Sequence, residues 1–280
     1  VNTAVSVTLS NPFSTTSGIV GFCLFLYDDN TSAVIATDGT TLIKIDSSNV
    51  VTTCVDADMP VHIPNPIFLD GYLFVAKADS ADIYNSNLND PMLWTAGDYI
   101  SAEMEGDYIK RIAKINNYLI ALGSNSIEYF WDSAEVSQSP LSRNDTPIKI
   151  NTYIGGFSQH GNTIYYIGAD EGGQPSVYTL KDFKIEEIGT PAVTRYLGVS
   201  TTGTENWYGC IVAGKGHTFY IINDTGNRTW VYDIETKVWT RWAYQAASLF
   251  NIRVSSYTIT DNGIASYFSL GNSSIIYKLD

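Results

Sequence analysis

The sequence predicts an all-β fold and, among all-β folds, a β-propeller of six blades with four antiparallel strands each. Two observations favour this class. Charged residues are only 16% of the chain, whereas 19 Tyr, 11 Phe and 6 Trp supply aromatic side chains that favour strands. A short strand pattern centred on tyrosine also recurs at intervals of 40 to 54 residues. Such a spacing is typical of propeller blades.

The recurring strand pattern is the first element of the prediction. Its copies are TLIKID (41–46), ADIYNS (81–86), SIEYFW (126–131), SVYTLK (176–181), WVYDIE (230–235) and IIYKLD (275–280). In this alignment Lys44 is followed in register by Tyr84, Tyr129, Tyr178, Tyr232 and Tyr277. We expect these tyrosines to pack between adjacent blades, because each ring buries a large apolar area. Aromatic residues that stack on a sugar would instead be exposed on loops, where Trp94, Trp131 and Trp207 are candidates.

Hairpin signals divide the sequence into blades. Glycine, asparagine and aspartate supply the positive φ angles of tight turns. They precede most copies of the pattern, at Asp70-Gly71, Asn116-Asn117, Gly161, Gly216 and Asn262-Gly263. We expect a single domain over residues 1–280, with blades at about 18–55, 65–97, 109–142, 153–190, 206–245 and 248–280. The segments between blades, including 97–107 and 190–205, are expected to be surface loops.

The last blade needs a fourth strand from elsewhere in the chain. The sequence ends at Asp280, just after the third strand of this blade, and an unpaired edge favours aggregation. Residues 4–10 alternate the apolar residues Val5, Val7 and Leu9. We therefore expect this N-terminal strand to pair with residues 274–279 and to close the propeller. Because the chain begins at Val1 without an initiator methionine, we also expect it to be part of a longer protein.

Charge, hydropathy and cysteine usage exclude several classes of protein. The 29 acidic and 16 basic residues give a net charge of −13, so we expect no sequence-specific binding of nucleic acid. The longest apolar run, Ile19 to Tyr27, has nine residues, far fewer than the roughly 20 that span a bilayer. No membrane insertion is expected. Cys23, Cys54 and Cys210 are an odd number without CxxC spacing, which indicates buried thiols rather than disulfides or a zinc site.

No motif predicts catalysis, a cofactor or a metal site. His62, His160 and His217 stand alone, without HxH or HExxH spacing, and the last two adjoin glycines of predicted turns. A propeller glycosidase would need paired carboxyl groups and usually an arginine cluster that holds an anionic sugar. The six arginines are scattered, at Arg111, Arg143, Arg195, Arg228, Arg241 and Arg253. We therefore expect that the protein is not an enzyme.

Three segments carry a resemblance to a known family. They are ADIYNSNLNDPMLWTAG (81–97), IKRIAKINNYLIALGSNSIEYFWDS (109–133) and GGQPSVYTL (172–180). These segments resemble the packaged-DNA stabilisation protein of short-tailed bacteriophages, also called the tail hub or tail accessory factor. The match is clearest over residues 65–190. The family brings no catalytic residues, so none is carried over.

The resemblance implies a structural protein of the virion tail that assembles in the cytoplasm of the bacterial host. Family members form a ring, typically hexameric, beneath the portal and its adaptor, and they close the channel after genome packaging. They also dock the tail needle and the tailspikes, which are therefore expected partners. The family proteins are longer than this chain, with extra segments that flank the propeller.

The residues are also compatible with two other functions. A carbohydrate-binding or glycan-cleaving propeller would bring carboxylates and arginines together in a central pocket. A protein-interaction propeller from a host or a secreted protein would have similar blades. Only the genomic neighbourhood would separate that protein from a phage component.

Overall fold

The computed structural model describes residues 13, 19–135, 138–144, 152–170, 172–199, 207–214, 216–223, 229–242, 252–260, 263–270 and 276–279, with backbone alone for 152–154, 199 and the strands after 251. Across these ranges the chain forms six antiparallel sheets and one short helix. It divides into two compact units, residues 1–150 and 151–280, which are described in turn. No helix in the described ranges is long and apolar enough to cross a membrane.

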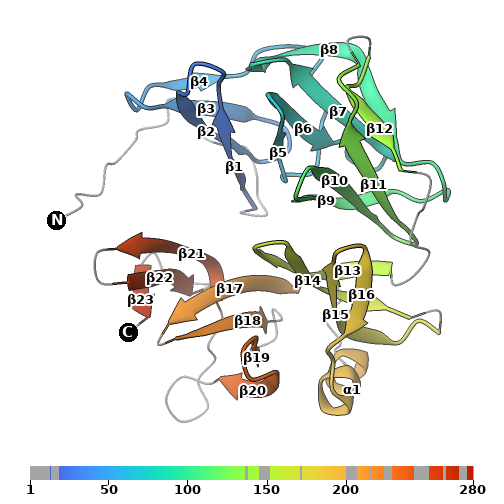
Figure 1. The fold of residues 1–280 in the computed structure, drawn as a ribbon, viewed down its shortest axis with the longest axis vertical. Coiled ribbons are helices and arrows are strands. Elements are labelled where there is room, and N and C mark those ends of the chain that lie inside the picture. Colours follow the sequence, from blue (N-terminus) through green and yellow to red (C-terminus); the bar gives the residue numbers. More distant parts are fainter. Residues whose placement is uncertain are drawn as a thin grey trace. The chain divides into compact units, whose positions relative to one another are not determined.

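The first unit contains three four-stranded sheets, in which the strands pair in the order of the sequence (Figure 1). The first sheet consists of β1 (Gly21–Leu26), β2 (Ser32–Thr37), β3 (Leu42–Asp46) and β4 (Val51–Thr53). The second sheet consists of β5 (Ile67–Leu69), β6 (Tyr72–Ala76), β7 (Asp82–Asn87) and β8 (Asp90–Ser101). The third sheet consists of β9 (Ile109–Ile115), β10 (Tyr118–Gly123), β11 (Ile127–Asp132) and β12 (Leu141–Arg143).

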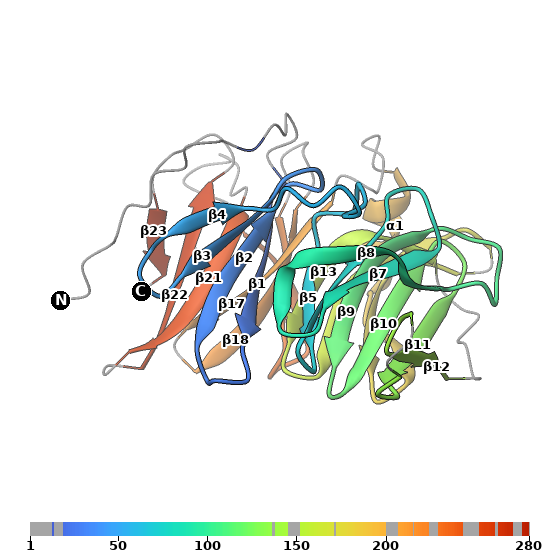
Figure 2. The ribbon, with the colours of Figure 1, turned by 90° about the horizontal axis from the view of Figure 1, so that it is seen from above.

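The second unit contains two four-stranded sheets and one three-stranded sheet, again paired in sequence order (Figure 1, and turned by 90° in Figure 2). The fourth sheet consists of β13 (Thr152–His160), β14 (Thr163–Ala169), β15 (Pro175–Lys181) and β16 (Lys184–Glu187). Helix α1 (Pro191–Val199) follows it. The fifth sheet consists of β17 (Tyr208–Gly214), β18 (His217–Asn223), β19 (Thr229–Asp233) and β20 (Val238–Trp242). The sixth consists of β21 (Ile252–Thr260), β22 (Gly263–Leu270) and β23 (Ile276–Leu279).

The all-β propeller class is confirmed, but the prediction of six four-stranded blades is wrong. Five sheets have four strands, whereas the sixth has three. Among the described residues β23 pairs with β22 alone, so the predicted closure by the N-terminal strand is wrong as well. The predicted closing residues Val5, Val7 and Leu9 lie outside the described residues. Three alternating apolar residues indicate a strand, but they do not specify which sheet edge that strand joins.

Two segments that were predicted as loops contain regular structure. β8 extends to Ser101 and so includes the first part of segment 97–107. Helix α1 occupies much of segment 190–205, with Pro191 at its first position, where the missing N–H is harmless. Val193 and Leu197 lie one helical turn apart and are both fully buried. Burial of this apolar pair stabilises a helix that would be marginal by itself.

Tight turns connect the strands of the hairpins. Asp70 and Gly71 take φ angles of 49° and 87° between β5 and β6, the pattern of a two-residue turn that matches the twist of a hairpin. Asn116 has a φ of 53° between β9 and β10, and Gly216 has a φ of 83° before β18. These turns confirm the predicted positions. The turn between β15 and β16 differs in its residue type, because the aromatic residue Phe183 takes a φ of 61°, which bulky side chains rarely adopt.

Apolar clusters join the sheets of the first unit. Because successive residues of a strand point to opposite faces, β6 contributes Leu73 and Val75 to one cluster and Phe74 to another. The first cluster lies between the first and second sheets and includes Phe25, Ile35 and Leu42. The second cluster lies between the second and third sheets and includes Leu69, Ile112 and Phe130. Each such side chain contributes about 1.5 to 3 kcal/mol through its burial.

A third cluster joins the fourth sheet, α1 and the fifth sheet in the second unit. It includes Tyr165, Ile167, Val193, Leu197, Tyr220 and Tyr232. The hydroxyl of Tyr220 also donates a hydrogen bond to the carbonyl oxygen of Gly156. The opposite face of the fifth sheet carries a smaller cluster, with Cys210, Val212, Ile221 and Val231. The fifth sheet is thus apolar on both faces, as expected for a blade inside a propeller.

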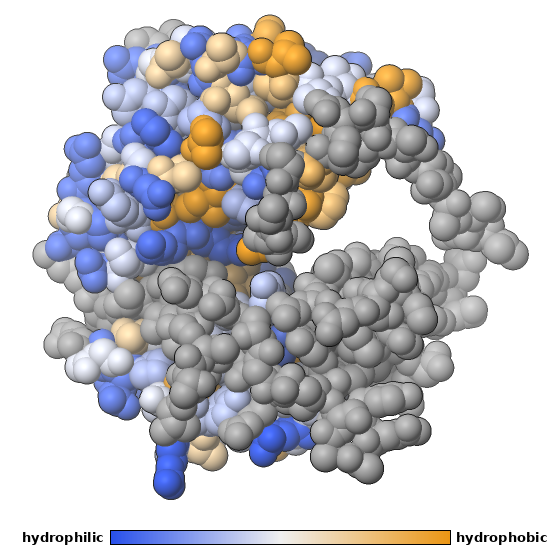
Figure 3. All heavy atoms as spheres, turned by 180° about the vertical axis from the view of Figure 1, so that it is seen from behind, coloured by the Kyte–Doolittle hydropathy of each residue, from blue (hydrophilic) through white to orange (hydrophobic). Residues whose placement is uncertain are grey.

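The first sheet has exposed apolar side chains on the face opposite its buried cluster. Phe22, Leu24 and Leu26 alternate with Phe25 along β1 and are 67%, 54% and 48% exposed. Val34, which pairs with Leu24, is 39% exposed. Figure 3 shows apolar side chains at the surface of the first unit. On this face Ala36, which pairs with Phe22, and Ile43, which pairs with Ala36, are nevertheless buried, at 1% and 2% exposure.

Candidate functional site

The predicted tyrosines lie in the third strands of their sheets. Tyr84 is in β7, Tyr129 in β11, Tyr178 in β15, Tyr232 in β19 and Tyr277 in β23, where only the backbone is described. Tyr84 packs in the cluster between the first two sheets, and Tyr232 packs in the cluster between the fourth and fifth sheets. Tyr129 lies on the face of β11 opposite to Phe130, which packs toward the second sheet. A shared strand position therefore does not give these tyrosines a shared face.

The buried tyrosines are packing groups rather than acids or bases. Burial raises the pKa of Tyr165 and of Tyr178 to about 12, and it raises the pKa of Tyr129 as well. These phenols stay neutral near pH 7. Tyr84 stacks on Tyr99 with ring centroids 5.0 Å apart, an arrangement that favours packing.

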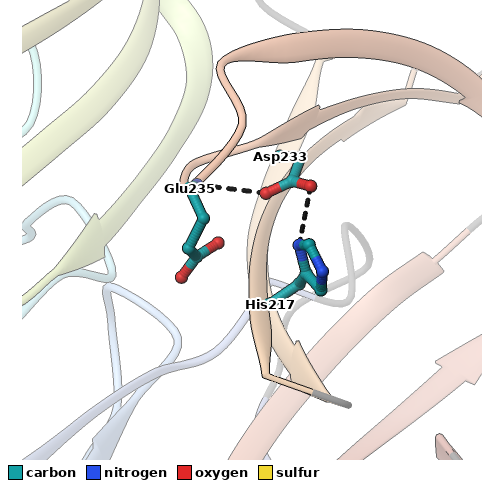
Figure 4. Close-up of side chains that lie close together, drawn as sticks. All are labelled: His217, Asp233 and Glu235. Atoms are coloured by element: carbon teal, nitrogen blue, oxygen red, sulfur yellow. Dashed lines mark hydrogen bonds and ion pairs between the residues drawn. The ribbon is translucent and has the colours of Figure 1, made fainter.

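Three side chains at one end of the fifth sheet bring a nitrogen and carboxylate oxygens together (Figure 4). His217 begins β18, Asp233 ends β19, and Glu235 follows in the next turn. His217 Nδ1 lies 2.8 Å from Asp233 Oδ2, and the three groups lie within 4.8 Å of one another. Such a set of donors suits zinc or a similar divalent ion. No sequence motif indicates the set, because its members come from β18, from β19 and from the turn after β19.

The carboxylates of this cluster already bind backbone amides. Asp233 Oδ1 accepts hydrogen bonds from the N–H of Glu235 and of Thr236, at 3.0 and 3.3 Å. Glu235 Oε2 accepts from the N–H of Thr218 at 2.7 Å. Slight burial raises the pKa of Asp233, but the hydrogen bonds from Thr236 and Glu235 outweigh it and lower the pKa to about 2. The cluster thus stabilises the turn after β19.

A buried ion pair within the third sheet joins β11 to β12 and anchors the segment that follows the second sheet. Arg143 Nε lies 3.2 Å from Glu128 Oε2, and the two side chains are 28% and 1% exposed. Glu128 Oε1 accepts from the N–H of Met104 at 3.1 Å, and the Arg143 guanidinium donates to the carbonyl of Ser101, the last residue of β8. Burial raises the pKa of Glu128, although Arg143 and the Met104 hydrogen bond oppose the rise. The pair holds the connection after β8 against the third sheet.

His62 is a buried histidine with two hydrogen bonds and is 3% exposed. Its Nδ1 donates to the carbonyl of Pro60, and its Nε2 accepts from the Thr37 hydroxyl, both at 2.8 Å. Burial lowers the pKa of His62, while the Pro60 carbonyl and the charge of Asp38 oppose this change. The neutral ring therefore fastens the segment before the second sheet to the first sheet.

An exposed tryptophan lines a hollow in the first unit. Of the three candidates for exposed aromatic residues, Trp94 and Trp207 are each 4% exposed, whereas Trp131 is 45% exposed. Trp131 lies directly opposite Tyr118 in the register of β10 and β11. The hollow has a volume of about 460 Å³ and is lined by Asp70, Asn116, Asn117, Tyr118, Trp131 and Asp132. This volume is within the range of small-ligand sites.

Together these features define a class of protein. The sheets are antiparallel and follow one another along the chain. Within each unit, clusters of buried apolar side chains pack between neighbouring sheets. The charged groups of the His217 cluster and of the Glu128–Arg143 pair bind backbone groups or one another. This is the arrangement of a β-propeller scaffold.

The chain belongs to the family described as Bacteriophage P22 Gp10, beta-propeller, whose model matches residues 8–264. It is therefore a member of a family of phage proteins that stabilise packaged DNA, as the sequence resemblance predicted. No curated protein matches the sequence.

Solved structures share the fold. Virginiamycin B lyase from Staphylococcus aureus is 14% identical, with a TM-score of 0.54 over 92% of this chain and 80% of that chain. A streptogramin B lyase is 15% identical, with a TM-score of 0.51 over 98% and 85% of the two chains. The N-terminal domain of Nup159 is 9% identical, with a TM-score of 0.50 over 99% and 84%. At these identities the likeness concerns the fold alone.

Proposed function

We propose that the chain is a structural, non-enzymatic tail component of a short-tailed phage that closes the portal channel over the packaged genome. In this role it assembles in the host cytoplasm and joins a ring, typically hexameric, beneath the portal and its adaptor. It also docks the tail needle and the tailspikes. The observation that carries the proposal is the family match over residues 8–264, which includes every strand from β1 to β21.

The geometry of the described residues supports a mechanical role. A channel closure must keep its shape under the pressure of packaged DNA. The buried clusters fasten neighbouring sheets to one another, and so does the hydrogen bond from Arg143 to the carbonyl of Ser101 at the end of β8. In the cluster of His217, Asp233 and Glu235 both carboxylates accept hydrogen bonds from backbone amides, and the His217 ring is bonded to Asp233. The net charge of −13 disfavours adhesion of DNA to this protein while the genome leaves the particle.

The proposal is tested by DNA retention in particles that lack the chain. Phage heads assembled without it are expected to package DNA and then to lose it, so that nuclease-protected DNA per particle falls sharply. Supply of the intact protein in trans should restore retention. Heads that keep their full DNA content without the chain would contradict the proposed closure of the channel.

A further inference from the structure

We propose that the hollow around Trp131 is a docking pocket for a positively charged side chain, an arginine or a lysine, of a partner protein in the virion. The inference rests on the proposed function, because it gives a chemical identity to one of the docking contacts. The pocket lies wholly within the first unit.

The ends of strands and turns build the pocket. Asp70 comes from the turn between β5 and β6, and Asn116 and Asn117 form the turn between β9 and β10. Trp131 and Asp132 are the last residues of β11. The second and third sheets carry these positions and share a buried cluster, so the pocket rests on a rigid base.

The charge of the pocket is negative. Asp70 and Asp132 contribute two carboxylates, and none of the six lining residues is basic. The ion pairs of the described residues do not include either aspartate. Asp132 Oδ1 accepts from the N–H of Ala134 at 2.7 Å, which leaves Oδ2 for another donor. An anionic ligand would be repelled here, whereas a cation would offset both charges.

The tryptophan adds a surface that suits the same ligand. All six tryptophans lie in the described part of the chain, and Trp131 is the one that is highly exposed. The face of an indole ring attracts a guanidinium or an ammonium group, and a planar guanidinium also stacks on it. Tryptophan and arginine are enriched among the residues that dominate protein interfaces.

The whole chain favours a cationic partner over a neutral one. Its net charge of −13 attracts basic surfaces over long range and raises the rate of their encounter. A pyranose ring could also stack on Trp131, but a neutral sugar would leave both carboxylates without a counter-charge. The two ligands therefore differ in their dependence on charge and on salt.

Nuclear magnetic resonance titration of the purified full chain tests the proposal. The probes are Nα-acetylarginine amide, its neutral analogue Nα-acetylcitrulline amide, and N-acetylglucosamine. The arginine derivative is expected to shift the indole N–H signal of Trp131 and the backbone signals of 116–118, and to bind about tenfold more tightly than the citrulline derivative. Added salt should weaken its binding.

Matched variants separate the pocket from general effects. Trp131→Ala, and the double variant Asp70→Asn with Asp132→Asn, should each weaken arginine binding about tenfold, as read from the backbone signals. Asparagine tolerates the positive φ of position 70 and keeps an acceptor for the Ala134 amide, so the double variant preserves both local structures. Tyr108→Ala and Asp79→Asn, at exposed positions outside the pocket, should leave binding unchanged.

Several outcomes would overturn the inference. These are equal binding of the arginine and citrulline derivatives, preferred binding of N-acetylglucosamine, and no response of the Trp131 signal to the arginine derivative. If the chain retains DNA in particles but its pocket fails these titrations, the inference fails and the proposed function stands. If particles without the chain keep their DNA, the proposed function fails whatever the titrations show.

Discussion

Removal of the arginine from the buried Glu128–Arg143 pair should destabilise the first unit. In Arg143→Ala the Glu128 carboxylate, which is 1% exposed, loses its counter-charge. Loss of one partner of a buried ion pair costs about 3 to 5 kcal/mol. Since Arg143 is itself 28% exposed, we expect the lower end, about 3 kcal/mol in the free energy of unfolding.

Replacement of the other partner should have a much smaller effect. In Glu128→Gln the side-chain oxygen still accepts from the Met104 amide, and the partly exposed Arg143 can be hydrated. The change also removes a charge that burial disfavours, so we expect a loss below about 1 kcal/mol. Arg143→Ala should therefore destabilise the protein much more than Glu128→Gln.

The effect of Arg143→Ala should also depend on pH. The pKa of Glu128 is raised in the folded protein above its ordinary value of 4.5, and removal of Arg143 raises it further. Protonated Glu128 has no charge to bury, so the loss of stability is largest well above the folded pKa. It should shrink as the pH falls toward 4.5.

Urea unfolding of the full chain, followed by far-ultraviolet circular dichroism, measures these differences. The control is Lys77→Ala, which removes a more exposed pair with Asp82 at 4.0 Å and should cost less than about 1 kcal/mol. The reasoning is refuted if Arg143→Ala destabilises no more than Lys77→Ala, or if Glu128→Gln proves the more damaging change.

Three further substitutions test other parts of the account. Phe183→Gly should stabilise the protein by about 1 kcal/mol in thermal unfolding, because glycine adopts the positive φ of this turn without strain; a lower melting temperature would contradict this. Phe74→Ala should lower the free energy of unfolding in urea by about 3 to 5 kcal/mol, because the Phe74 ring is fully buried. The control Val55→Ala, at a site that is 93% exposed, should change it very little. Similar losses for the two variants would count against the described core. Burial lowers the pKa of His62 in the folded protein below 6.5, so the contribution of its neutral ring to stability is complete above pH 6.5 and is lost as the pH falls through the folded pKa. The difference in unfolding free energy between the wild type and His62→Gln should therefore shrink on acidification. A difference that does not change with pH would be inconsistent with a buried neutral ring.

Local sequence signals predicted the features that depend on local chemistry. Asp70-Gly71 forms the expected tight turn because these residues tolerate positive φ, and the repeated tyrosines lie in third strands because the pattern marks a strand next to a hairpin. The segments 81–97, 109–133 and 172–180 carry the family resemblance, which the family match confirms.

Features that depend on distant parts of the chain were not predictable in this way. Val5, Val7 and Leu9 indicated a strand but not its partner, so the last sheet was wrongly given four strands. Helix α1 escaped notice because its β-branched residues and Gly198 have poor helix propensity, although Thr190 and Pro191 form a usable start signal.

The candidate pocket also combines separate segments. Trp131 was one of three aromatic candidates in the sequence, and only the fold distinguishes it from the buried Trp94 and Trp207. Its acidic neighbour Asp70 belongs to a different sheet. No local pattern could bring these two residues together.

The most direct test of the central claim, that this protein is a mechanical part of the virion, is electron cryomicroscopy of intact phage particles. The account predicts density for the described sheets in a ring at the portal vertex, below the adaptor and across the DNA channel. Particles that retain their genome with no copy of this chain at the portal vertex would contradict it.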